Sequence, residues 1–102
     1  AKEDLSDFQG AISDYNKAIK IDPSKGSAYR DRGYAKRKLK DYQGAISDYN
    51  KAIEINPRDA DPFRNRGIAK EIIGDMKGAC ADWRKASELG DEESAKWVSN
   101  QC

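Results

Sequence analysis

The 102-residue sequence contains no histidine and only two cysteines. Without histidine, imidazole-based acid–base catalysis and most zinc sites are excluded. Cys80 and Cys102 are a single, widely separated pair, which is not the spacing of a metal-binding framework. No apolar run approaches the roughly 20 residues of a membrane-spanning helix, and no glycine-rich phosphate loop is present. We therefore expect no catalytic residue, no cofactor, no metal site and no membrane insertion.

The composition is also poor in apolar residues. Charged residues make up 36% of the chain, and the mean hydropathy is -0.98. A compact globule with one central core would be thinly supplied, whereas a stack of repeats buries only the seams between its units. The net charge of +1 implies no bulk attraction to nucleic acid or to membranes.

What the chain does contain is an internal repeat. Residues Asp7–Pro23 and Asp41–Pro57 are identical at 14 of 17 positions, and Asp75–Asp91 follows the same frame more loosely. The copies begin at Asp7, Asp41 and Asp75, so the interval between them is constant. A fixed period of this length is typical of stacked supersecondary units.

Each copy predicts one helix, and a second helix is predicted between successive copies. The apolar residues recur three or four positions apart and form one stripe. Aspartates at the starts are expected to be N-caps, and Gly90 is expected to end the third copy. The helices are expected at 7–22, 28–40, 42–57, 62–73, 76–89 and 92–101, with N-caps at Asp7, Asp41 and Asp75. Gly33 and Gly67 fall inside helices, which indicates close approach of a neighbouring helix backbone.

The pattern resembles the tetratricopeptide repeat, which has two helices in each repeat and the motif W-x2-L-G-x2-Y, then A-x3-F, then P. The two complete units supply the corresponding residues Tyr29, Arg32, Gly33, Lys36, Ala45, Tyr49 and Pro57, then Phe63, Arg66, Gly67, Lys70, Ala79 and Trp83. Arginine replaces the leucine of the motif, and lysine its second aromatic residue. The resemblance implies an all-α solenoid of antiparallel helix pairs.

We interpret the chain as one domain. It comprises a partial repeat (1–23), two full repeats (24–57 and 58–91) and a C-terminal capping helix (92–102). Residues Ala1–Ser6 are interpreted as the end of a helix whose beginning lies outside the sequence.

The family resemblance implies a non-catalytic module that binds a peptide or partner protein in a concave groove lined by the first helix of each pair. The groove residues expected here are Arg30, Tyr34, Arg37, Lys38, Arg64, Asn65, Ile68 and Ile72. One branch of the family clamps C-terminal carboxylates with a basic residue and an asparagine one turn later. Tyr34 and Ile68 occupy the asparagine positions, so this specificity is not carried over.

The segment Ser24–Lys40 has a net charge of +6, between acidic copies of the repeated helix. Neighbouring acidic residues could balance this charge on an ordinary solvated surface. Alternatively, the segment forms an electropositive groove for an acidic peptide. Nucleic acid is the least favoured partner, because the overall charge is not basic and aromatic residues suited to base stacking are few.

An alternative function is structural assembly. The first repeated helix keeps its apolar stripe, but the helix that would cover it is reduced to Ala1–Ser6. Phe8, Ile12 and Tyr15 would then be partly uncovered, and such patches tend to bind partners. We therefore predict homo-oligomerisation through this end.

The two cysteines are expected to pair. If residues 92–101 fold back antiparallel on residues 76–89, Cys102 falls beside Cys80, and small neighbours allow the close approach that a disulfide needs. Without the bond, Cys80 is a small buried residue and Cys102 a terminal thiol. The default compartment is cytoplasmic, and a disulfide would favour the periplasm or secretion.

Overall fold

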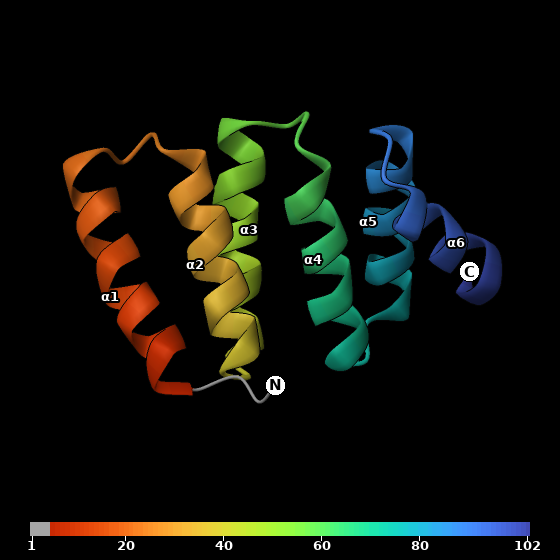
Figure 1. Cartoon of the computed structure of the whole chain (residues 1–102). Coiled ribbons are helices and arrows are strands. Elements are labelled where there is room, and N and C mark those ends of the chain that lie inside the picture. The colour runs from red at the N-terminus through yellow and green to blue at the C-terminus, as the bar shows by residue number, and fades with distance from the viewer. Residues whose placement is uncertain (1–4) are drawn as a thin grey trace.

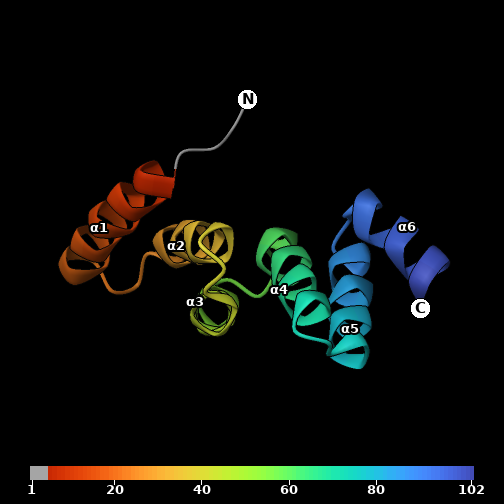
Figure 2. The same cartoon turned by 90° about the horizontal axis from the view of Figure 1, so that it is seen from below.

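The computed structural model describes residues 5–102, which form six α-helices and no strand. In chain order these are α1 (Leu5–Ile21), α2 (Gly26–Lys38), α3 (Tyr42–Ile55), α4 (Ala60–Ile72), α5 (Met76–Glu88) and α6 (Glu92–Gln101). Each helix packs against the next one in the chain, and α2 also contacts α4. Figure 1 shows the resulting row of helices, and Figure 2 shows α3 lying below α2 when the row is viewed from below. The predicted all-α solenoid is confirmed.

The capping aspartates are confirmed in two of three places. Asp41 accepts a hydrogen bond from the Gly44 N–H at 3.0 Å, and Asp75 accepts one from the Gly78 N–H at 2.9 Å. The prediction for Asp7 was wrong, because α1 already begins at Leu5. Asp7 therefore lies in the first turn of the helix, where its negative charge still interacts favourably with the helix dipole. For the same reason, residues 5 and 6 do not belong to a preceding helix. Residues 1–4 of that prediction lie outside the described range.

Several helix boundaries differ from the prediction by a few residues. The helices α2 and α4 begin two residues earlier than expected, at Gly26 and Ala60, and each ends earlier. The start of α4 is fixed by Asp59, whose side chain accepts a hydrogen bond from the Asp61 N–H at 3.1 Å. Gly90 follows α5 with a φ of 104°, a conformation that favours glycine, and α6 has the predicted bounds.

The interior is built from small residues and from three buried aromatic rings, those of Tyr49, Phe63 and Trp83. Tyr49 and Trp83 are 0% and 1% exposed, and they lie against Gly33 and Gly67. A Cβ atom at Gly33 would lie 2.8 Å from the Tyr49 ring, and one at Gly67 would lie still closer to Trp83 Nε1. The glycines therefore make room for an aromatic side chain, and the predicted close approach of a helix backbone was wrong.

The last helix is attached to α5 by a tilted contact between two tryptophan rings and by a disulfide. The rings of Trp83 and Trp97 have centroids 5.1 Å apart. Cys80 and Cys102 form a disulfide with Cα atoms 5.9 Å apart. Together these contacts hold α6 against α5.

In the part of the chain that is described, no helix has the length and apolar character needed to cross a membrane.

Candidate functional site

A buried ion cluster joins α2 to the helices on both sides of it. Arg32 donates two hydrogen bonds to the Asp48 carboxylate, at 2.8 and 2.6 Å, and Lys36 Nζ lies 3.2 Å from the same carboxylate. Arg32 also donates to the Asn16 side chain of α1 at 2.9 Å. The hydrogen bonds to Asp48 raise the pKa of Arg32. One guanidinium therefore links α1, α2 and α3.

The same cluster recurs one period later on α4. Arg66 donates to the Asp82 carboxylate at 2.8 and 2.6 Å, and Lys70 Nζ lies 3.1 Å from it. Arg66 also donates to the Asn50 side chain at 2.8 Å. Asp82 is 4% exposed, and these two cations supply its counter-charge.

Sequence reasoning missed these clusters, although the signal was present. On the sequence, Arg32 and Arg66 stand out only as departures from the family motif. Each is followed four residues later by a lysine and sixteen residues later by an aspartate. A departure that recurs together with a complementary charge at fixed spacing indicates a paired contact.

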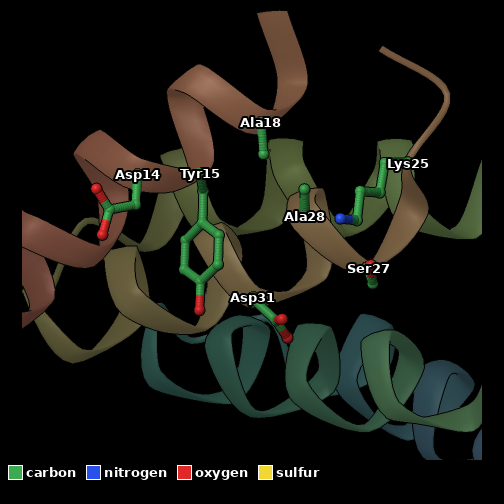
Figure 3. A pocket seen from close by; sticks show the side chains of 7 residues that line it. All are labelled: Asp14, Tyr15, Ala18, Lys25, Ser27, Ala28 and Asp31. Carbon is green, nitrogen blue, oxygen red and sulfur yellow. The ribbon is translucent and has the colours of Figure 1, made fainter. Parts of the chain in front are cut away.

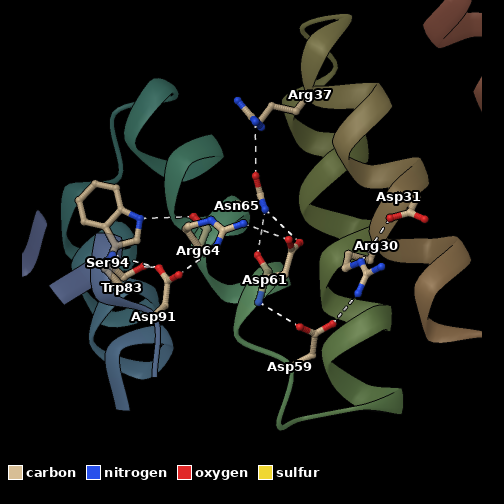
Figure 4. Close-up of polar contacts among 10 residues, drawn as sticks. All are labelled: Arg30, Asp31, Arg37, Asp59, Asp61, Arg64, Asn65, Trp83, Asp91 and Ser94. Atoms are coloured by element: carbon tan, nitrogen blue, oxygen red, sulfur yellow. Dashed lines mark hydrogen bonds and ion pairs between the residues drawn. The ribbon is translucent and has the colours of Figure 1, made fainter. Parts of the chain in front are cut away.

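Two further arginines, one on α2 and one on α4, form ion pairs with the N-cap residues of α4 and α6 (Figure 4). Arg30 Nη1 donates to Asp59, the N-cap of α4, at 3.0 Å, and Arg64 Nη1 donates to Asp91, the N-cap of α6, at 2.9 Å. Burial opposes the ionised form of Asp91, but hydrogen bonds from Ser94 and Arg64 outweigh it and lower the pKa of this carboxyl. Both arginines are therefore already neutralised by carboxylates.

Arg37 and Lys38 lie in a different setting, around the exposed ring of Tyr34. The Arg37 guanidinium carbon lies 5.3 Å from the ring centroid and Lys38 Nζ lies 5.6 Å from it. The Phe8 ring of α1 is 6.3 Å from Tyr34, centroid to centroid. Arg37 Nη2 donates a long hydrogen bond of 3.3 Å to Asn65 of α4. We call Phe8, Tyr34, Arg37 and Lys38 the Tyr34 cluster.

Family models match two parts of the chain. A tetratricopeptide repeat model matches residues 1–25 and a TPR repeat model matches residues 33–71, which together are more than half of the sequence. The chain is a tetratricopeptide repeat (TPR) protein. No curated protein matches the sequence.

Solved TPR structures share its fold. An Arabidopsis OM64 TPR domain superposes with a TM-score of 0.88 at 29% identity, over 94% of this chain and 80% of that one. The first TPR of Spaghetti (RPAP3), bound to the HSP90 peptide SRMEEVD, superposes with a TM-score of 0.87 at 25% identity, over 93% of this chain and 77% of that one.

The structure brings only some of the expected groove residues of this TPR protein together. Tyr34, Arg37 and Lys38 form one cluster, and Asn65 adjoins it through Arg37. The side chain of Asn65 is largely buried and also donates to the Asp61 backbone and side chain. Ile68 is half-buried and Ile72 is exposed, at 49%, on the same helix.

The N-terminal end of the TPR stack has a pocket of about 320 Å³ between α1 and the start of α2 (Figure 3). It is lined by Asp14, Tyr15, Ala18, Lys25, Ser27, Ala28 and Asp31. Partial burial raises the pKa of Tyr15, as do the nearby carboxylates of Asp31 and Asp14. Phe8, Ile12 and Tyr15 are each half-buried. In residues 5–102 no group of acidic or cysteine side chains could hold a metal ion.

Proposed function

We propose that this TPR protein binds an acidic peptide segment of a partner protein, and that the Tyr34 cluster is its recognition surface. The single observation that carries the proposal is that Arg37 lacks a carboxylate partner. Four other arginines, at positions 30, 32, 64 and 66, are paired with carboxylates. Arg37 forms no ion pair within residues 5–102, and it lies beside an aromatic ring that is 38% exposed. An unbalanced cation beside an exposed ring suits a peptide with carboxylate and apolar groups.

The chemistry of a related complex supports this choice. The peptide SRMEEVD bound to the Spaghetti TPR carries three acidic residues and a methionine. Tyr34 and Ile68 stand where the carboxylate-clamping branch of the family has asparagine, so we propose acidic peptide binding without that specificity.

The repeat division accompanies this proposal. We propose a single binding domain with a partial repeat at 1–23, full repeats at 24–57 and 58–91, and a cap at 92–102. The proposed groove then runs across the first helices of the two full repeats.

Reversing the charges of Arg30 and Arg37 together should weaken binding of the probe peptide SRMEEVD. We expect a loss of about tenfold and a flatter salt dependence, since surface charge pairs contribute up to about 1 kcal/mol each. Most of the loss should come from Arg37→Glu, because Arg30 is already paired with Asp59. Fluorescence anisotropy at several salt concentrations measures both quantities.

Two controls accompany this measurement. Arg58→Glu removes a basic residue from the exposed turn before α4 and should leave affinity nearly unchanged. The uncharged analogue SRMQQVN should bind weakly to the unaltered protein. Equal affinity of the unaltered protein and the Arg30→Glu/Arg37→Glu variant for SRMEEVD would show that the Tyr34 cluster is not the recognition surface.

Self-association is the second candidate function, and the partial exposure of the N-terminal end favours it. Tyr15 is half-buried, whereas the residues one and two periods later, Tyr49 and Trp83, are buried. We predict concentration-dependent dimerisation in sedimentation velocity experiments, reduced by Phe8→Ser or Ile12→Ser. Leu89→Ser, at the half-buried C-terminal end of α5, serves as the control. A single monomeric species at high concentration would rule this function out.

A further inference from the structure

The TPR stack contains the same helix-binding surface, here called a seat, three times, and within residues 5–102 a preceding helix covers two of these seats. Each seat is an aspartate, an aromatic residue and an alanine on one helix: Asp14, Tyr15 and Ala18 on α1; Asp48, Tyr49 and Ala52 on α3; Asp82, Trp83 and Ala86 on α5. The seats on α3 and α5 are buried, and they are covered by α2 and α4. On α1 the aspartate is exposed, and the tyrosine and alanine are half-buried.

The filled seats define what such a seat accepts. In both, the covering helix places an arginine and, four residues later, a lysine on the aspartate, as Arg66 and Lys70 do on Asp82. The residue after the arginine is a glycine that lies against the aromatic ring. The common element is therefore a helix with the pattern Arg-Gly-x-x-Lys.

Two neighbouring positions make the open seat selective. In the filled seats, an arginine two residues before this pattern pairs with the N-cap of the following helix, Asp59 or Asp91. At the open seat that N-cap is Lys25, whose side chain makes no capping hydrogen bond. The residue that receives Arg37 in the α3 seat is Asn65, and the residue one period before Asn65 is Asp31. Lys25 and Asp31 both line the pocket.

We propose that the α1–α2 pocket seats one α-helix of a partner protein with the pattern Glu-x-Arg-Gly-x-x-Lys-Arg, where aspartate can replace glutamate and lysine the last arginine. The acidic residue faces Lys25, the first arginine and the lysine bind Asp14, and the glycine lies against Tyr15. The last basic residue faces Asp31. Each of these contacts is based on the equivalent contact at α3 and α5. Where the residue at α1 or α2 has a different charge, the partner residue is changed to the complementary charge.

The charges argue against a second copy of this chain as the occupant. Its two helices with the core pattern carry Arg30 and Arg64 where the acidic residue is required, so either would face Lys25 with a like charge. Both helices are also already bound to Asp48 and Asp82. A second copy would have to break one of those clusters in order to dock.

The test uses the full chain and two synthetic peptides. One is the α2 segment, residues 26–40, with Arg30→Glu (GSAYEDRGYAKRKLK), and the other is the same segment unchanged. The glutamate peptide should bind about fivefold more tightly, which is the effect expected of one exposed charge pair. Lys25→Asp in the protein should reverse that order, whereas Lys20→Asp, on the exposed surface of α1, should preserve it. Affinity is measured by fluorescence anisotropy at low protein concentration.

Further variants separate specific seating from general charge attraction. Gly33→Leu in the glutamate peptide raises helix propensity, yet it should weaken binding more than tenfold by overpacking against Tyr15. Asp14→Lys in the protein should have a similar effect and should be rescued by exchanging Arg32 of the peptide for aspartate. Equal binding of both peptides, no effect of Lys25→Asp, or a dimer that excludes both peptides would overturn the proposal. The anisotropy of SRMEEVD on the same variants reports separately on the Tyr34 cluster.

Discussion

Replacing Asp82 with alanine should lower the free energy of unfolding by about 3 kcal/mol, because it leaves two cations without their buried counter-charge. The Asp82 side chain is 5% exposed, and those of Arg66 and Lys70 are 17% and 22% exposed. Both cations are thus mostly buried, but water still reaches part of each side chain. For this reason we place the loss at the low end of the range for buried ion pairs.

The repeat supplies a matched control at the same position. Asp14 stands two periods before Asp82, on the exposed surface of α1, and it forms no ion pair within residues 5–102. Asp14→Ala should therefore change the free energy of unfolding by less than about 0.5 kcal/mol. Urea unfolding followed by circular dichroism at neutral pH compares the two variants. Equal losses would mean that the contribution of Asp82 comes from its position in the helix and not from the cluster.

The fold could be predicted from the sequence because the residues that specify it recur at a fixed interval. A fixed repeat with one apolar stripe per copy specifies a helix, its partner and the seam between them, whatever the surface residues are. Asp41 and Asp75 were recognisable for the same reason, since capping is a local interaction within four residues. The prediction for Asp7 failed because the residues before an aspartate can also adopt helical dihedral angles, which places the aspartate within the first turn of the helix.

The site was less predictable because it depends on side-chain partners from distant helices. Family geometry indicates which helix face is concave, and on that basis Arg30 and Arg64 were expected to meet a ligand. The structure gives them Asp59 and Asp91 instead, the N-caps of α4 and α6, each two helices further along the chain. Arg37 differs only because the residue opposite it is Asn65 and not an aspartate. One amide in place of one carboxylate thus leaves Arg37, unlike Arg30 and Arg64, without an ion pair within residues 5–102.

The mid-helix glycines show the same limit at atomic scale. We expected a neighbouring helix backbone to lie close to Gly33 and Gly67, but an aromatic side chain lies there instead. The period could not reveal that an aromatic ring makes the approach, because that depends on the rotamers of Tyr49 and Trp83.

Reducing the disulfide between Cys80 and Cys102 should lower the free energy of unfolding by about 3 kcal/mol, the loop-closure value for a separation of this size. The bond closes a loop that contains α6 and most of α5, so its loss frees the last helix first. Trp97 should then become more exposed. It packs on Trp83, and the disulfide of Cys102 keeps the end of its helix attached to α5. Urea unfolding with and without reductant, together with tryptophan fluorescence, measures both effects.

The variant Cys102→Ser provides the control, because it should match the reduced protein and be insensitive to reductant. Thiol titration of unfolded protein, matured in its native compartment and kept free of reductant, tests whether the bond forms there. We expect no free thiol, because the two cysteines of the chain are bonded to each other in the structure. Two free thiols would contradict the bond in that compartment. Cys80 would then act as a small apolar residue of the α5 seam.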